Sequence, residues 1–321
     1  MKFIITGYQQ VIQLIQICNH YLTVLDEMKL EKASFIISDG VYFYTYEQAL
    51  ALKLISFKIV DNHFVRVDEQ ILVGTTLTHL AYSHRFNRLL GASYHDGTIG
   101  YVSVKEGYFT QAWVTIGDHS EQGLSRPHWL GVSPKEDEVA VVNISQDRIG
   151  IYDAASMHLK RDLYLPKGCG PRHALWNQQG TRLFVVTEYS NQVMCIDGAS
   201  GSFIAGHSTL STLNPFSYGA TLCFDRNEEH LYVSNRGDDT IACFRVVDNN
   251  FILESHIPTF GQHSRHMILS HDETYLISAN KNSNQVVWIN TKTHEKEYTH
   301  PFVEPSGLVE VLLEKDSLCI I

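Results

Sequence analysis

Residues 170–193, GPRHALWNQQGTRLFVVTEYSNQV, carry three side chains suited to acid–base and anion-binding chemistry. Arg172 and His173 stand near the beginning of this stretch, and Glu188 follows close to its end. An arginine guanidinium presents a planar fork that matches the oxygens of a carboxylate or a phosphate. Histidine and glutamate commonly accept or donate protons in catalysis. If the three side chains meet in the fold, they predict a site for a small anionic ligand.

The segments around these residues alternate between apolar and other side chains, and the pattern recurs along the chain. Period-two alternation of Val, Ile, Tyr and Phe indicates strands rather than helices. Segments that begin at positions 78, 127, 172, 220 and 265 each contain three apolar runs separated by polar turns. Equivalent positions of the third run are spaced by 50, 44, 48 and 45 residues, at Ile99, Ile149, Val193, Ile241 and Val286.

A repeat of this length predicts the fold class. A fainter copy begins at Ala33, and the leftover segments at the two ends supply the strands of a seventh unit. Units of about 45 residues with roughly four strands each are typical of β-propellers. We therefore predict one all-β domain over residues 1–321, a seven-bladed β-propeller of four-stranded antiparallel blades. Two β-sandwiches would not explain the near-constant period.

Local signals refine this prediction. The segments FKIVDNHFVRVDE and FRVVDNNFILESH predict hairpins that turn on Asp61-Asn62 and on Asp248-Asn249. The residues SGLVEVLL near the end fit a strand better than a helix. We expect this C-terminal strand to pair with the N-terminal blade, which closes the ring and removes a free sheet edge.

Blade geometry predicts where the polar residues gather. The first strand of a propeller blade lines the channel, and the second runs back beside it at about 5 Å. The start of the first strand and the end of the second therefore share one mouth of the channel. We call the residues at equivalent positions of successive blades a column. At the start of the first strand this column is His79, His128, His173, Thr221 and His266, and we interpret His79 as structural.

The column at the end of the second strand changes character from blade to blade. Because a requirement of the repeat would give similar residues, we assign Glu188 and Arg236 to a site, whereas Lys281 fits a solvated rim equally well. Arg172 and Arg265, just before the first strand in two blades, point to the same mouth. The whole column reads Tyr94, Ile144, Glu188, Arg236 and Lys281.

Composition excludes several classes of function. The 321 residues are 44% hydrophobic and 19% charged, with a formal net charge of −10, which argues against nucleic acid as the main partner. No stretch approaches the ~18 apolar residues of a membrane span, and no signal peptide pattern occurs, so we expect a cytoplasmic protein. The six cysteines are scattered without a CxxC pair, which predicts reduced, mostly buried thiols. No metal-binding motif or glycine-rich nucleotide loop is present, so we expect no metal and no cofactor.

In combination, the motifs GPRH, VVTEYS, LYVSNRGDD and SRHMILSHDETYLISAN resemble the seven-bladed β-propeller lactonase family. That family includes the bacterial propeller type of 6-phosphogluconolactonase and the fungal carboxy-muconate cyclases. The resemblance covers residues 33–290 and, more weakly, the ends. It implies a cytoplasmic hydrolase of carbohydrate metabolism, in the pentose phosphate pathway. The catalytic residues that it implies are His128, Arg172, Glu188 and Arg236.

The resemblance implies hydrolysis of a sugar-phosphate lactone by activated water. Glu188 or His128 would be the general base, while Arg172 and Arg236 would stabilise the oxyanion or hold the anionic group. The further candidates for contacts to the substrate are His173, Arg265 and Lys281.

Two other functions stay open at the level of sequence. The same basic pocket would serve a cycloisomerase that acts on a muconate carboxylate. A non-catalytic propeller that binds partners across its faces is the alternative from another class. The absence of any Trp-Asp dipeptide weighs against the commonest scaffold repeat.

Overall fold

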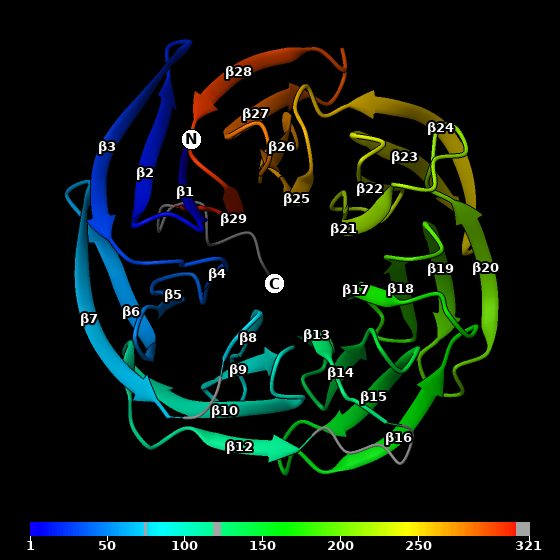
Figure 1. Ribbon diagram of the computed structural model, residues 1–321, viewed down its shortest axis with the longest axis horizontal. Coiled ribbons are helices and arrows are strands. Elements are labelled where there is room, and N and C mark those ends of the chain that lie inside the picture. The colour runs from blue at the N-terminus through cyan, green and yellow to red at the C-terminus, as the bar shows by residue number, and fades with distance from the viewer. Residues whose placement is uncertain (74–75, 118–122, 313–321) are drawn as a thin grey trace.

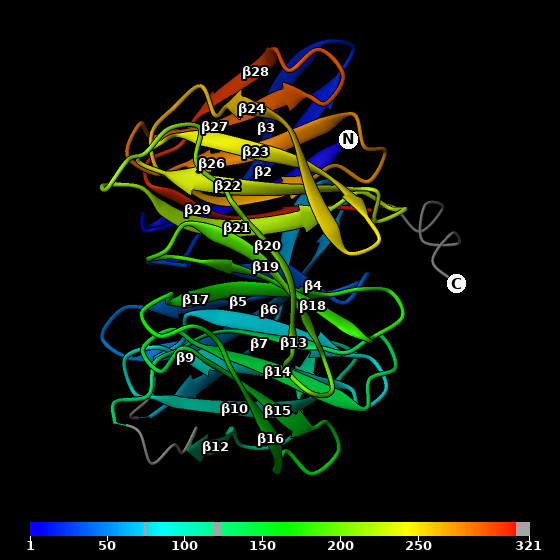
Figure 2. The ribbon, with the colours of Figure 1, turned by 90° about the vertical axis from the view of Figure 1, so that its right-hand side faces the viewer.

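Seven antiparallel sheets are arranged in a ring around a central channel in the computed structural model (Figure 1). It describes residues 1–73, 76–117 and 123–312, and those residues form strands without any helix. Figure 2 shows the blades from the side, with their strands crossing between the two faces of the ring. The all-β, seven-bladed prediction is confirmed.

The blades follow one another in chain order, except that the first combines both ends of the chain. Blade 1 has the order β29-β1-β2-β3, and the outer strand of blade 3 is divided, since β11 and β12 both pair with β10. Blade 1 consists of β29 (Pro305–Glu310), β1 (Lys2–Gly7), β2 (Val11–Cys18) and β3 (Tyr21–Lys29). Blade 2 consists of β4 (Ile36–Ser38), β5 (Phe43–Gln48), β6 (Leu52–Val60) and β7 (His63–Leu72). Blade 3 consists of β8 (His79–Ser83), β9 (Arg88–Ser93), β10 (Thr98–Lys105), β11 (Tyr108–Phe109) and β12 (Val114–Gly117).

The remaining blades are regular and four-stranded. Blade 4 consists of β13 (Pro127–Val132), β14 (Glu138–Asn143), β15 (Arg148–Asp153) and β16 (Leu159–Tyr164). Blade 5 consists of β17 (Pro171–Trp176), β18 (Arg182–Thr187), β19 (Gln192–Asp197) and β20 (Phe203–Ser208). Blade 6 consists of β21 (Tyr218–Phe224), β22 (His230–Arg236), β23 (Thr240–Val247) and β24 (Asn250–Pro258). Blade 7 consists of β25 (Ser264–Leu269), β26 (Tyr275–Asn280), β27 (Gln285–Asn290) and β28 (Lys296–Pro301).

The core is divided into seven apolar clusters, each lying between two neighbouring blades. Every sheet is therefore covered on both faces, which explains why the second and third strands of the blades are rich in Val, Ile and Leu. Since the described residues form no helix, they contain no helix that could span a membrane. The five described cysteines are unpaired, and three of them are buried; Cys319 lies outside the described residues.

The predicted hairpins and the predicted ring closure are both confirmed. Asp61 and Asn62 have φ of 49° and 69°, and Asp248 and Asn249 have 51° and 64°, which are the positive values that a type I′ turn requires. The C-terminal strand β29 pairs antiparallel with β1 and becomes the innermost strand of blade 1.

Three inner strands share an irregularity that decides which of their side chains face the channel. The register shifts between Pro127 and Trp129 in β13, between Pro171 and His173 in β17, and between Ser264 and His266 in β25. Each shift is a β-bulge, in which one extra residue interrupts the alternation of side chains across the strand. The extra residues are His128, Arg172 and Arg265.

These bulges correct one sequence prediction. The predicted column placed His128 beside His173 at the start of the first strand. The register instead makes His128 equivalent to Arg172 and Arg265, while Trp129 is equivalent to His173. The alignment was wrong by one residue because an inserted bulge residue leaves no signature in apolar periodicity.

Closure of the ring generates a stability prediction. Leu308 of β29 is 2% exposed and packs with Phe3 and Ile5 against blade 7, so Leu308→Ala will lower the free energy of unfolding by about 2–5 kcal/mol. The control Val303→Ala, at a site 47% exposed, will stay within about 0.5 kcal/mol of wild type. Equal urea midpoints for the two variants would show that the closing strand contributes little.

Candidate active site

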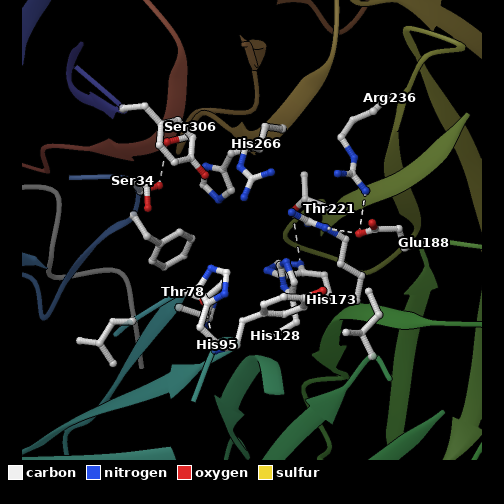
Figure 3. Close-up of a pocket in the computed structure, with 18 of the residues that line it drawn as sticks. Ser34, Thr78, His95, His128, His173, Glu188, Thr221, Arg236, His266 and Ser306 are labelled. Carbon is white, nitrogen blue, oxygen red and sulfur yellow. Dashed lines mark hydrogen bonds and ion pairs between the residues drawn. The ribbon is translucent and has the colours of Figure 1, made fainter. Parts of the chain in front are cut away.

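A pocket of about 290 Å³ opens at one mouth of the channel, and all seven blades contribute to its lining. Figure 3 shows Glu188 and Arg236 on one side of this pocket and Ser34 and Ser306 on the other. Concave sites of this kind, with convergent polar groups, are the usual location of small-molecule binding. One lining residue from each blade, in ring order, is Ser306, Ser34, Thr78, His128, Arg172, Thr221 and Arg265.

The centre of the charged side is a carboxylate shared by two arginines, here called the acid–arginine cluster (Arg172, Glu188 and Arg236). Glu188 Oε2 lies 3.0 Å from Arg172 Nε and 2.8 Å from Arg236 Nη2. The two arginines are only 4% and 5% exposed, so their charges are held largely out of water. Charged groups in such a setting require a close partner, which Glu188 supplies to both.

Backbone carbonyls of β21 add one hydrogen-bond acceptor to each guanidinium group. Arg172 Nη1 donates to the carbonyl oxygen of Ala220, and Arg236 Nη2 donates to that of Gly219 at 2.9 Å. The register of β21 is irregular between Gly219 and Leu222. At this irregularity the successive carbonyls of Gly219 and Ala220 accept hydrogen bonds from the two arginines. A Cβ on Gly219 would lie 2.4 Å from the carbonyl oxygen of Thr187, so only glycine permits this close approach of blades 5 and 6.

The charges determine the protonation of Glu188. Burial raises the pKa of its carboxyl, but the neighbouring charges of Arg172 and Arg236 outweigh burial and hold the pKa below its usual value. Glu188 is therefore ionised at neutral pH. A carboxylate already engaged by two arginines is a weak base, and its geometry suits it to positioning the guanidinium groups.

His128 lies in the pocket as a neutral imidazole with a free nitrogen. Its Nδ1 is buried and has no hydrogen-bond partner among the described residues, while its ring packs edge-on against Tyr94 at 6.0 Å. Burial lowers the pKa of His128 well below the ordinary value, and the positive charges of Arg172 and Arg265 lower it further. An unprotonated, unpartnered imidazole can accept a proton from a bound water or hydroxyl.

Below these groups, aromatic and histidine rings form a contiguous layer across the channel. His79 contacts Phe35 at 4.3 Å and His173 at 5.5 Å between ring centroids, and His173 contacts Trp129 at 5.5 Å. His266 extends the layer with its ring 5.4 Å from that of Phe35. The rings of Phe35, His79, His173 and His266 line the pocket, and we refer to them as its floor.

The predicted substrate-contacting residues divide into two groups. His173 and Arg265 line the pocket, and Arg265 lies with Cζ 5.4 Å from the ring centroid of Tyr8 without an ion-pair partner among the described residues. Lys281 is outside the lining, 4.7 Å from the Tyr8 ring and 3.6 Å from a Glu304 carboxylate oxygen. The predicted catalytic residues His128, Arg172, Glu188 and Arg236 all lie in the one pocket.

Sequence reasoning missed the residues supplied by the divergent blades. Tyr8 follows β1 as Glu188 follows β18, and Ser306 lies at the bulge of β29 as Arg172 does at that of β17. Extending the two columns to blades 1 and 2 would have found them. Ser34 and Gln48 complete the set from blade 2.

Other chemistries find little support in this part of the molecule. In the ranges that the structure describes, no three His, Cys, Asp or Glu side chains are grouped so that they could hold a metal ion. Burial raises the pKa of the Cys169 thiol to about 12, which makes this neighbour of the mouth a poor nucleophile.

Comparisons with known proteins agree with this architecture. Residues 3–300 match a family model described as "Lactonase, 7-bladed beta-propeller". A 6-phosphogluconolactonase of Bacillus subtilis is 24% identical over 237 residues, which cover 69% of this chain and 68% of that protein. An uncharacterized protein of Staphylococcus epidermidis is 31% identical over 180 residues, 54% of this chain and 53% of the relative, so the match spans about half the length of each. A crystal structure of a protein from Lactobacillus plantarum superimposes with a TM-score of 0.84 at 20% identity, covering 96% of this chain and 99% of that one.

The acid–arginine cluster generates a prediction about stability. Glu188→Gln leaves two buried guanidinium groups without a counter-charge and will lower the free energy of unfolding by about 2 kcal/mol, somewhat less than for a fully buried pair because Glu188 is partly exposed. Phosphate will recover part of this loss in thermal unfolding, since an anion that binds the native arginines stabilises the fold. Sodium chloride of equal ionic strength is the control.

A matched variant is Glu304→Gln, which removes the exposed partner of Lys281 and will change stability little. If phosphate stabilises both variants equally, the pocket does not bind anions through these arginines.

Proposed function

The chain belongs to the seven-bladed β-propeller lactonase family, and we propose that it hydrolyses a lactone that carries an anionic group, of the 6-phosphogluconolactone type. The observation that carries this proposal is the charge balance of the pocket. Among the described residues of the lining, Arg172, Arg236 and Arg265 face one carboxylate, Glu188, and the histidines beside them are neutral. The excess of positive charge favours an anionic substrate. The name of the Bacillus subtilis relative supports a sugar-phosphate lactone.

In the proposed mechanism a water molecule attacks the lactone carbonyl. His128, neutral and with Nδ1 free, takes the proton from this water as the bond to the carbonyl carbon forms. The carbonyl oxygen becomes an oxyanion, which Arg172 and Arg236 stabilise because Glu188 and the β21 carbonyls hold their guanidinium groups in place. The ring C–O bond then breaks, and protonated His128 returns its proton to the departing ring oxygen. The product is a hydroxy acid.

The remaining predicted residues bind the substrate. Arg265 has no counter-ion among the described residues and is assigned to the remote anionic group. His173 forms part of the floor of the pocket, and its Nδ1 makes a hydrogen bond of 3.2 Å with Thr221 Oγ1. Lys281 lies at the rim and attracts anions as they approach.

The direct test is an assay of 6-phosphogluconolactone hydrolysis, in parallel with δ-gluconolactone, which lacks the phosphate. We expect a higher kcat/KM for the phosphorylated substrate, and a substantial part of that advantage will disappear in Arg265→Ala. Turnover of neither lactone would overturn the proposed function, and turnover of a muconate carboxylate instead would replace it with cycloisomerisation.

His128→Asn tests the assignment of the base. We expect kcat to fall by about 10²–10⁴ with a small change in KM, because general-base catalysis acts on the chemical step. His84→Asn is the control, since His84 is exposed and follows β8 on the face opposite to the pocket. Unchanged kcat in His128→Asn would transfer the role of base to another residue.

The pH dependence follows from the protonation of His128. The base acts unprotonated, and burial with the nearby arginines holds its pKa well below 6.5. The value of kcat/KM will therefore stay near its plateau at about pH 6 and fall only as the pH drops through the lowered pKa. Initial rates corrected for spontaneous hydrolysis give this profile. A decline already centred above pH 6.5 would contradict the assignment.

A further inference from the structure

Three histidines occupy equivalent positions on inner strands, and two of them are engaged by the scaffold. Nδ1 of His79 on β8 accepts a hydrogen bond of 3.4 Å from the backbone N–H of Leu130 in the next blade. His173 on β17 shares a hydrogen bond at Nδ1 with Thr221, again on the next blade, at 3.2 Å. In both cases the nitrogen links neighbouring inner strands.

His266 on β25 lacks this partner. The next inner strand is β29, where the register places Gly307 at the position equivalent to Thr221 and His173. Glycine has no side chain to offer, and it is required there because a Cβ would lie 2.2 Å from Thr6 Oγ1. His266 Nδ1 is accordingly buried with no hydrogen-bond partner among the described residues.

The His266 side chain belongs to the lining of the pocket. His266 and its neighbour Arg265 both line the pocket at the bulge in β25, and Figure 3 shows the His266 side chain there. The edge-on contact with Phe35 fixes the ring from one side. Leaving a buried polar atom unpaired costs free energy, so a site that retains one usually pairs it with a ligand or an ordered water.

The charge state of His266 indicates which group it binds. Burial, followed by the charge of Arg172, lowers the pKa of His266 to about 4, so the imidazole is neutral at pH 7. A neutral imidazole pairs well with a hydroxyl, which can either donate or accept. The anionic group is served by the adjacent Arg265.

We propose that His266 is a substrate-binding residue that recognises an uncharged hydroxyl group of the lactone through Nδ1. The inference rests on the proposed function and extends it, since it names a second, uncharged recognition point one residue from Arg265. A lactone with both an anionic group and free hydroxyls is the substrate class that fits both.

Two variants test the inference in the 6-phosphogluconolactone assay. His266→Phe keeps a ring against Phe35 but removes the nitrogens. We expect KM to rise about tenfold while kcat stays within about twofold of wild type. The reason is that the lost hydrogen bond is made equally in the ground state and in the transition state. His266→Asn places an amide near the position of Nδ1 and will keep KM within about threefold of wild type. A purely structural role would lower the active fraction and thus kcat, leaving KM unchanged.

His79→Phe is the matched variant, because its nitrogen binds the scaffold. It will lower the midpoint of thermal unfolding more than His266→Phe does and raise KM less. If His266→Phe fails to fold, His266→Leu and His266→Asn replace the comparison, since the two side chains are similar in size and differ in hydrogen bonding. Equal KM values for that pair overturn the inference.

The outcomes separate the two proposals. An inactive wild type overturns the proposed function and the inference with it. An active wild type whose KM is unchanged in His266→Phe overturns the inference alone, and assigns the free nitrogen to an ordered water.

Discussion

The structure of the pocket depends on one shared carboxylate. Two guanidinium groups, each about 5% exposed or less, approach Glu188 from different blades and would repel each other without it. The attraction operates where water is largely excluded, so it is stronger than on the surface, and so is the penalty for losing it. The carbonyls of Gly219 and Ala220 provide one further acceptor to each guanidinium group. The relative placement of blades 5 and 6 is thus coupled to the charge of the site.

A repeated fold produces this arrangement without repeated chemistry. Equivalent positions of the inner strands hold a histidine, arginines, serines and a threonine around one mouth. The apolar clusters between blades fix the strands, while the bulges in β13, β17, β25 and β29 turn an extra residue of each of these strands towards the channel. Those residues lie outside the apolar clusters between the blades, so one architecture can carry different side chains at the mouth and serve several reactions.

The fold was predictable from sequence because it repeats. Periodicity gave the seven blades, the antiparallel strands, the Asp-Asn hairpins and the terminal closure, and each of these depends on local pattern. The grouping of Arg172, Glu188 and Arg236 was also foreseen, since strand ends meet by geometry. What could not be foreseen were the bulges, because one inserted residue does not disturb the apolar pattern. The positions of His128 and Trp129 were therefore misaligned. The engagement or freedom of a histidine nitrogen, as at His173 and His266, depends on the neighbouring blade and has no trace in local sequence.

The closing blade has a consequence for shortened chains. Tyr8 reaches the pocket from the segment after β1, where its backbone N–H is held by the carbonyl of Glu304, and Ser306 comes from β29 itself. One wall of the pocket thus joins two segments from opposite ends of the described chain. A variant cut before Glu304 would keep Arg172, Glu188 and Arg236 but would lose Ser306 and the carbonyl that holds Tyr8, so this wall would be unfinished.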